Sequence, residues 1–87
     1  TAGFDSGAAW MSLALQAKTM GLFAHAMGGF DGDALASAIA LPVGHTLHCV
    51  VAAGEQGPAE TLPEDLRARE RPSGRKPVDE TARHGRF

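Results

Sequence analysis

The distribution of apolar and polar positions near the start of this chain predicts a long buried helix. Apolar residues occupy nearly every side of the segment that runs from about residue 6 to Met20. A helix that is apolar on all sides is expected to be buried rather than amphipathic. Asp5 or Ser6 is a suitable N-cap, and Gly21 is a suitable C-terminal stop. The pattern therefore predicts one helix that needs cover around its whole circumference.

A second, shorter helix is expected over residues 32–40. Asp31 stands at the N-cap position, and Asp33 in the first turn suits the positive end of the helix dipole. Pro42 ends the segment, because the residue before a proline disfavours helical backbone angles. The sequence therefore predicts a capped helix that begins directly after the glycine pair Gly28-Gly29.

One convincing strand is predicted over residues 46–53, closed by Gly54. It is apolar on both faces apart from His48, which is typical of a central strand covered on both sides. Each backbone group left unpaired in a buried setting costs about 1–3 kcal/mol, so such a strand needs neighbours on both edges. The chain offers at most one further strand, residues 23–27. We therefore expect these residues to belong to a larger α+β fold, or to fold only with partner chains.

The last third of the chain is polar and is predicted to form an arm. Thr61 and Glu64, with a proline between them, look like a capping box that opens a short helix to about Glu70. The stretch Pro72-Ser73-Gly74 then breaks this helix. We divide the chain into residues 1–54, the core helices and strand, and residues 55–87, a polar C-terminal arm of the same domain.

Charge supports this division and excludes some functions. Of the 87 residues 44% are hydrophobic and 21% charged, a globular composition with a net charge of −2. Residues 55–87 hold 7 acidic and 7 basic residues, and the first 54 hold only Asp5, Lys18, Asp31 and Asp33. There is no basic footprint for nucleic acid and no apolar run of about 20 residues for a bilayer. The single Cys49 is expected to be an inert buried thiol within the strand, which suits a cytoplasmic protein.

The glycine pair is the candidate ligand site. Two adjacent residues without Cβ atoms let another molecule approach the backbone amides closely. The helix N-terminus just beyond adds unpaired N–H groups and partial positive charge. An electron-rich planar or anionic ligand would fit this arrangement, and a tight turn without any ligand is the alternative. The four histidines fit no metal-ligand spacing, so no metal is expected.

Four segments occur in a characteristic order. They are residues 5–17 followed by Gly21-Leu22, residues 27–31, Leu41-Pro42 before the strand, and residues 75–80. Together they resemble the C-terminal portion of the nitroreductase family of FMN-dependent oxidoreductases. In that comparison they match the long central helix, the loop over the flavin ring, the core strand with its closing glycine, and a basic-proline element.

The resemblance implies a flavin site shared between the two subunits of a homodimer. It places the backbone at Met27, Gly28 and Gly29 against the N5/O4 edge of the flavin ring and Arg75 at the FMN phosphate, where Lys76 either assists or is only solvated. It also implies hydride transfer from NAD(P)H through flavin N5 to a nitroaromatic or quinone-like acceptor. No side chain of this chain is expected to act as an acid–base catalyst.

Two departures from the family pattern limit this expectation. Many family members have Glu where Gly28 stands, and the family's Arg-Ser-Arg phosphate cluster has no counterpart here. The first half of the expected domain is absent, and the chain begins at Thr1 rather than Met. These 87 residues alone are therefore expected to hold FMN poorly and not to turn over. The alternative is a non-catalytic remnant, an oligomerising fragment or a flavin-sequestering fragment.

Overall fold

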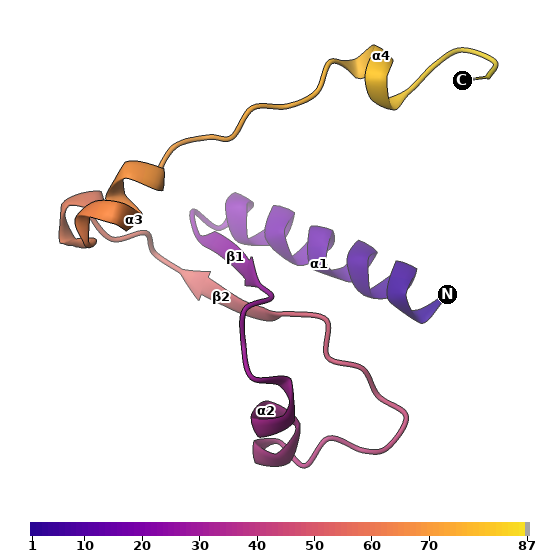
Figure 1. The fold of residues 1–87 in the computed structure, drawn as a ribbon, viewed down its shortest axis with the longest axis vertical. Coiled ribbons are helices and arrows are strands. Elements are labelled where there is room, and N and C mark those ends of the chain that lie inside the picture. The colour runs from indigo at the N-terminus through magenta and orange to yellow at the C-terminus, as the bar shows by residue number, and fades with distance from the viewer. Residues whose placement is uncertain (87) are drawn as a thin grey trace. The chain divides into compact units, whose positions relative to one another are not determined.

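The computed structural model describes residues 1–86, and the chain divides into two units at Gln56 and Gly57. Unit 1 contains α1 (Ala2–Thr19), β1 (Phe23–Met27), α2 (Gly32–Ala38) and β2 (Val50–Gly54). Unit 2 contains η1 (Ala59–Thr61), α3 (Glu64–Arg69) and α4 (Val78–Thr81), as Figure 1 shows. The chain is therefore an α+β structure with one two-stranded sheet. The assignment of residues 1–54 and 55–87 to a core and an arm of one domain stays a prediction.

The start of α1 differs from the predicted one. The helix begins at Ala2 with Thr1 as its N-cap, so the expected cap at Asp5 or Ser6 was wrong. The Asp5 N–H donates to the Thr1 carbonyl (2.9 Å), and the Ser6 hydroxyl donates to the Ala2 carbonyl (2.8 Å). Both residues thus lie inside the helix, because the backbone upstream of them already supplies the acceptors of the first turn.

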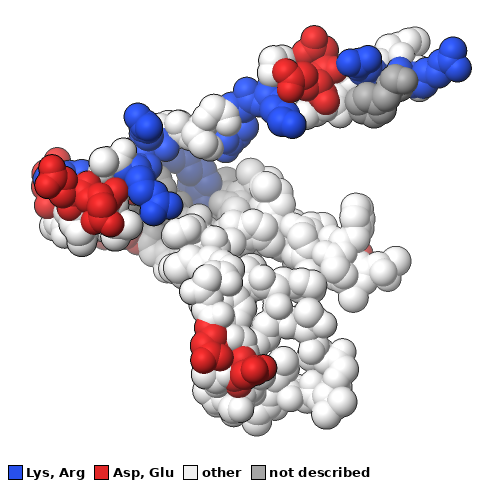
Figure 2. All heavy atoms as spheres, viewed as in Figure 1, with Lys and Arg blue, Asp and Glu red and all other residues white. Residues whose placement is uncertain are grey.

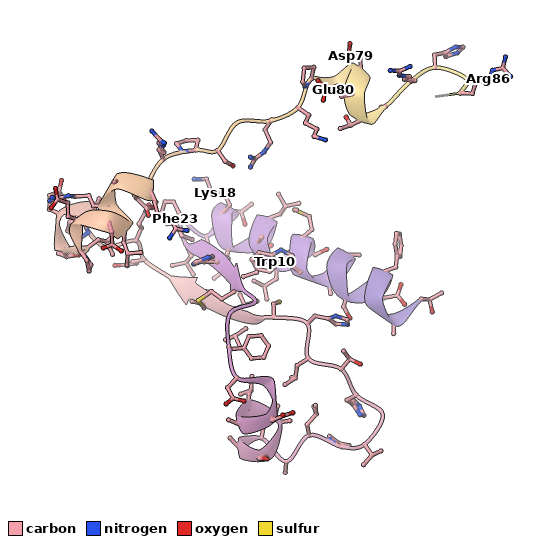
Figure 3. All side chains as sticks on the ribbon, in the orientation of Figure 1. Trp10, Lys18, Phe23, Asp79, Glu80 and Arg86 are labelled. Carbon is pink, nitrogen blue, oxygen red and sulfur yellow. The ribbon has the colours of Figure 1, made fainter. Side chains whose placement is uncertain are left out.

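The predicted stop at Gly21 is confirmed. Gly21 has φ +75°, its N–H donates to the Lys18 carbonyl (3.1 Å), and the Leu22 N–H donates to the Ala17 carbonyl (2.8 Å). This is the Schellman arrangement, which glycine favours because the left-handed conformation crowds a Cβ atom. The Lys18 Nζ then lies 5.0 Å from the centre of the Phe23 ring (Figure 3), a cation–π contact that joins the helix end to β1.

The two strands pair antiparallel, in a register that runs from Phe23 opposite Gly54 to Met27 opposite Val50. The strand expected at residues 23–27 is confirmed. The strand expected at residues 46–53 is shorter at its start and includes Gly54. β2 starts late because β1 ends at Met27, where the chain turns away from the sheet. Residues 46–49 therefore have no ladder partner among the described residues.

The interior of the described chain is very small. Ala17 is its single buried hydrophobic residue, with 7% of its surface exposed, while Trp10 and Ala14 on the same side of α1 are half-buried. Within unit 1, α1 packs against β1 along this side (Figure 1). The described residues therefore cover one side of α1 and not the whole circumference that its apolar sequence predicts. A two-stranded sheet and one short helix offer too little surface to do more.

α2 ends earlier than predicted. It stops at Ala38 and not at residue 40, because Ala40 takes a positive φ of 50°. The Ala40 N–H donates to the Ser37 carbonyl (3.2 Å), and the Leu41 N–H donates to the Ala36 carbonyl (2.9 Å). The helix thus closes with a second Schellman arrangement in which alanine occupies the place that glycine favours.

In unit 2 the helix near residue 64 is confirmed, and its predicted capping box is wrong. α3 follows Pro63, with no side-chain cap hydrogen bond. The Thr61 hydroxyl instead donates to the Pro58 carbonyl (2.7 Å) and closes η1. The four-residue α4 lies in the polar arm, where the sequence pattern predicted no helix after residue 70. No helix among residues 1–86 combines the length and the apolar character needed to cross a bilayer.

Ala40→Gly is expected to raise the free energy of unfolding by about 1 kcal/mol, because a left-handed residue with a Cβ atom carries that much strain. Ala36→Gly, inside the same helix, is the matched control and should lower it by about 1 kcal/mol. Urea unfolding followed by circular dichroism measures both changes. A loss of stability in Ala40→Gly would show that the terminus of α2 is not formed as described.

Candidate ligand site at the glycine turn

The candidate site is the turn through which the chain leaves the sheet. β1 ends at Met27, and Gly28 and Gly29 follow at the surface. The Phe30 N–H donates to the Gly28 carbonyl (3.1 Å), which closes a three-residue turn. Phe30 is half-buried, and its ring lies 4.0 Å from the point where a Cβ atom at Gly32 would stand. The turn is thus held at one end by the β ladder and at the other by the start of α2.

The N–H groups of Gly28 and Gly29 have no hydrogen-bond acceptor among the described residues. A Cβ atom added at either glycine would meet no atom within 4 Å, and neither residue has a positive φ. This distinguishes them from Gly21 and Gly44, whose φ values of +75° and +87° explain why glycine stands there. Neither the backbone conformation nor packing inside the described chain requires glycine at positions 28 and 29.

Glycines that no local geometry requires are a conformational disadvantage of roughly 0.5–1 kcal/mol each relative to alanine. Their absent side chains leave the two amides accessible to a group outside the described residues. Two neighbouring N–H donors at the surface suit a flat molecule that carries hydrogen-bond acceptors along its edge. Such a molecule can approach backbone without Cβ atoms more closely than backbone with them. The site therefore has the donor chemistry that a flavin ring edge would use.

The charge beyond the turn bears on which kind of ligand can bind there. Asp31 does cap α2, since its Oδ1 accepts from the Ala34 N–H at 2.9 Å. The same carboxylate, together with Asp33 in the first turn, places negative charge at this helix end. Figure 2 shows acidic side chains, and no basic ones, over the region of α2. Of the two kinds of ligand that we expected here, an electron-rich planar edge therefore suits the donors of the turn better than an anion does.

The predicted phosphate contacts lie in unit 2. The Arg75 Nη1 donates to the Ser73 hydroxyl (2.5 Å), the Ser73 carbonyl (3.2 Å) and the Gly74 carbonyl (3.1 Å). Arg75 and Lys76 are both exposed. Tying one guanidinium nitrogen to its own loop orients the planar group, whose other N–H donors remain for an external acceptor. Ser73 is the residue that sequence reasoning missed, although its position two residues before Arg75 was a readable signal.

The five predicted site residues thus fall into two groups on separate units. Met27, Gly28 and Gly29 share one turn, and Arg75 and Lys76 share one loop. The structure describes each group by itself, so their binding of one common ligand stays a prediction.

The remaining candidate residues have more ordinary surroundings. Cys49 is a half-buried free thiol that precedes β2, so its predicted place inside the strand was wrong. Within residues 1–86 no group of three or more histidine, cysteine, aspartate or glutamate side chains is arranged to hold a metal ion. The His45 ring lies 3.2 Å from the Pro42 carbonyl, and the His48 ring lies beside Gly3 of α1.

Comparison with known proteins finds a sequence relative and a solved structure that are similar to this chain. No family model matches the chain. The sequence is 38% identical, over 99% of its length, to an uncharacterised 15.4 kDa protein in the ask 5′ region of Mycolicibacterium smegmatis. The fold is similar to the crystal structure of an oxidoreductase containing FMN, with a TM-score of 0.91 and 44% identity over 97% of this chain.

Both of these proteins are longer than the matched region. The chain spans 58% of the mycobacterial relative and 42% of the oxidoreductase chain. The likeness therefore concerns one part of each protein.

Asp31→Ala is expected to lower the free energy of unfolding by about 1 kcal/mol, because the Ala34 N–H loses its side-chain acceptor. Asp31→Asn keeps a cap oxygen and should stay within about 0.5 kcal/mol of the parent. Asp33→Ala, two residues further along the first turn, is the control for removal of charge alone. Urea denaturation compares the three variants, and equal losses in Asp31→Ala and Asp33→Ala would contradict the cap.

Proposed function

We propose that this chain is the C-terminal portion of an FMN-dependent oxidoreductase of nitroreductase type. The observation that carries the proposal is the likeness to the FMN-containing oxidoreductase, at 44% identity and a TM-score of 0.91 over nearly the whole chain. Sequence identity at that level is higher than two proteins that share only a fold would have. The two surface glycines that the local structure does not require are independent support.

In this proposal the backbone of Met27, Gly28 and Gly29 meets the rim of the flavin ring. The two glycine N–H groups donate to ring acceptors, and the empty space at both Cβ positions accommodates the close approach. Backbone amides do this without adding a titratable group beside the ring. Arg75, oriented by Ser73, and Lys76 neutralise an FMN phosphate.

When bound, FMN supplies the redox chemistry, with NAD(P)H as the reductant and a nitroaromatic or quinone-like compound as the acceptor. The part played by this chain is to position and polarise the ring edge rather than to transfer protons. The proposal includes a second copy of the protein as partner and a cytoplasmic location. No nucleic acid, membrane or metal takes part in it.

The second candidate is a fragment that sequesters flavin or has no activity. What favours it is coverage, since the chain spans 42% of the oxidoreductase that it is similar to. The two candidates differ in one simple measurement on the natural protein that contains these residues. An oxidoreductase is yellow and loses its visible absorbance when NADH or NADPH is added without oxygen. A sequestering protein is yellow and keeps its absorbance, and an inactive fragment stays colourless after incubation with FMN.

Gly28→Ala and Gly29→Ala are expected to weaken FMN binding by about tenfold or more, because each new methyl group occupies space against the ring. The same changes should leave the stability of the apoprotein unchanged or raise it by roughly 0.5 kcal/mol, since both φ values suit alanine. Fluorescence titration with FMN and urea unfolding measure the two effects in the natural protein.

Gly57→Ala, at another glycine whose Cβ position is empty, is the matched control and should leave FMN affinity unchanged. If Gly28→Ala and Gly29→Ala bound FMN as tightly as the parent protein, the glycine turn would not be the flavin contact.

Arg75→Ala is expected to weaken binding of FMN by about tenfold while changing the affinity for riboflavin less than twofold, because riboflavin lacks the phosphate. Arg67→Ala, a charge-matched change on α3, should affect neither ligand. Parallel titrations with the two flavins provide the comparison. An equal loss for FMN and riboflavin would assign Arg75 a structural role instead of a phosphate contact.

A further inference from the structure

Ser73 lies in an irregular, exposed segment of unit 2. Residues 70–77 connect α3 to α4 without forming a helix or a strand, and each of them is exposed. Pro72 and Gly74 flank the serine, and both disfavour continuation of a helix through this position. An enzyme that binds a short stretch of extended backbone therefore reaches this hydroxyl group without unfolding any described element.

The hydroxyl group of Ser73 also differs in its hydrogen bonding. Several other hydroxyl groups donate to backbone carbonyls of their own helix or helical turn: Ser6, Ser12, Thr19, Thr61 and Thr81. The Ser73 Oγ instead accepts from a cation, since the Arg75 Nη1 donates to it at 2.5 Å. A guanidinium group at this distance favours negative charge on the atom that it contacts. The position is thus suited to an anionic form of the side chain.

Basic residues flank the serine on both sides. Arg69 and Arg71 stand four and two residues before Ser73, and Arg75 and Lys76 stand two and three residues after it. Figure 2 shows basic side chains over the segment between α3 and α4. Charge patterns of this kind are one means by which protein kinases select their substrates.

Ser37 in α2 provides the contrast. No lysine or arginine lies between Lys18 and Arg67, the stretch that contains Ser37. Its backbone is also helical, so it lacks both features of the Ser73 segment.

We propose that Ser73 is a phosphorylation site for a serine kinase that selects basic substrates, and that its phosphate group pairs with Arg75. The phosphoryl donor is a nucleoside triphosphate. A bond forms between the Ser73 Oγ and the γ-phosphorus while the bond from that phosphorus to the β–γ bridging oxygen breaks. The hydroxyl proton passes to the base of the kinase, and the nucleoside diphosphate leaves with the electron pair.

Phosphorylation at this position changes what Arg75 can bind. The added group carries about −1.5 to −2 charges at pH 7 and three strong acceptor oxygens. It is attached to the same Oγ that the guanidinium already contacts, so the two groups pair within their own loop. A phosphate held in the same chain competes effectively with one that arrives from solution.

This competition is the regulatory consequence, and it rests on the proposed function, in which Arg75 contacts the phosphate of FMN. Phosphorylation of Ser73 lowers the affinity for FMN because two phosphates compete for one guanidinium group. Whether Ser73 is phosphorylated does not depend on any flavin, so the two proposals can fail separately.

The first experiment locates the modification in the natural protein that contains these residues. The protein is incubated with Mg²⁺-ATP and a purified serine kinase that requires arginine before its acceptor, and its peptides are sequenced by mass spectrometry. We expect one phosphate on Ser73 and none on Ser37. The double variant Arg69→Ala with Arg71→Ala should slow the labelling by about tenfold, because it removes the positive charge that the kinase recognises. Arg86→Ala is the charge-matched control and should be labelled at the parent rate.

The second experiment compares the phosphorylated protein with the same sample after phosphatase treatment. Phosphorylation is expected to weaken FMN binding by about tenfold or more and to change riboflavin binding less than twofold, because riboflavin has no phosphate. In an Arg75→Ala variant, phosphorylation should change FMN affinity less than threefold, since the group for which the phosphates compete is absent.

The proposal is overturned if Ser73 stays unmodified in the intact protein while other substrates of the kinase are labelled. An equal loss of affinity for FMN and riboflavin would also overturn it, since competition at Arg75 affects FMN alone. If FMN binding is unchanged by phosphorylation, the Arg75→Ala titration identifies which proposal has failed. A weakened Arg75→Ala variant means that the pairing of Ser73 phosphate with Arg75 is wrong, and an unaffected one means that the FMN phosphate contact is wrong.

Discussion

The pairing of β1 with β2 is the constraint on which the rest of unit 1 depends. Five residue pairs, from Phe23 opposite Gly54 to Met27 opposite Val50, join segments separated by α2 and its connections. α1 is tied to this sheet by the Schellman turn at Gly21 and by the contact of Lys18 with Phe23. The last pair of the ladder also fixes the point where the chain leaves the sheet, and that point is the glycine turn. The sheet therefore determines where the candidate ligand donors lie.

The glycine turn combines tight anchoring with unused hydrogen-bonding capacity. Its ends are held by the ladder at Met27 and by the cap that Asp31 provides for α2. Between them, two amides remain without acceptors and two Cβ positions are empty. Donors that are held in place before a ligand arrives lose little conformational entropy on binding, which is what electrostatic positioning of a ring edge requires. The surrounding carboxylates make a neutral edge a better match than a phosphate.

The described part of the chain encloses a very small interior. With Ala17 as the one buried apolar residue in the described part of the chain, burial of apolar surface inside the chain contributes little. The exposed apolar side chains of α1, among them Phe4, Met11 and Leu15, form a surface of the kind that other elements cover. The second edge of β2 leaves backbone N–H and C=O groups for a further strand. The relatives are longer proteins, of which this chain spans 58% and 42%. A longer protein or a second copy of the chain can supply the cover.

Local sequence signals predicted the parts of the fold that depend on nearest neighbours. The stop at Gly21, the cap at Asp31 and the short strand at residues 23–27 each follow from a few adjacent residues, and the structure confirms all three. The helix ends at Thr1 and Ala40 were not predicted correctly, and neither was the hydrogen bond of the Thr61 side chain. In each case alternative hydrogen-bond acceptors lie within one turn.

Tertiary structure decided what depends on distant partners. The start of β2 at Val50 follows from the length of β1, and the exposed apolar face of α1 follows from which side of this helix the sheet covers. The sequence by itself determined that two glycines precede a capped helix and that α1 is apolar on all sides. Only the tertiary structure showed that neither the backbone conformation nor the local packing requires glycine at these two positions. Backbone angles and the empty space around a residue depend on its neighbours in three dimensions.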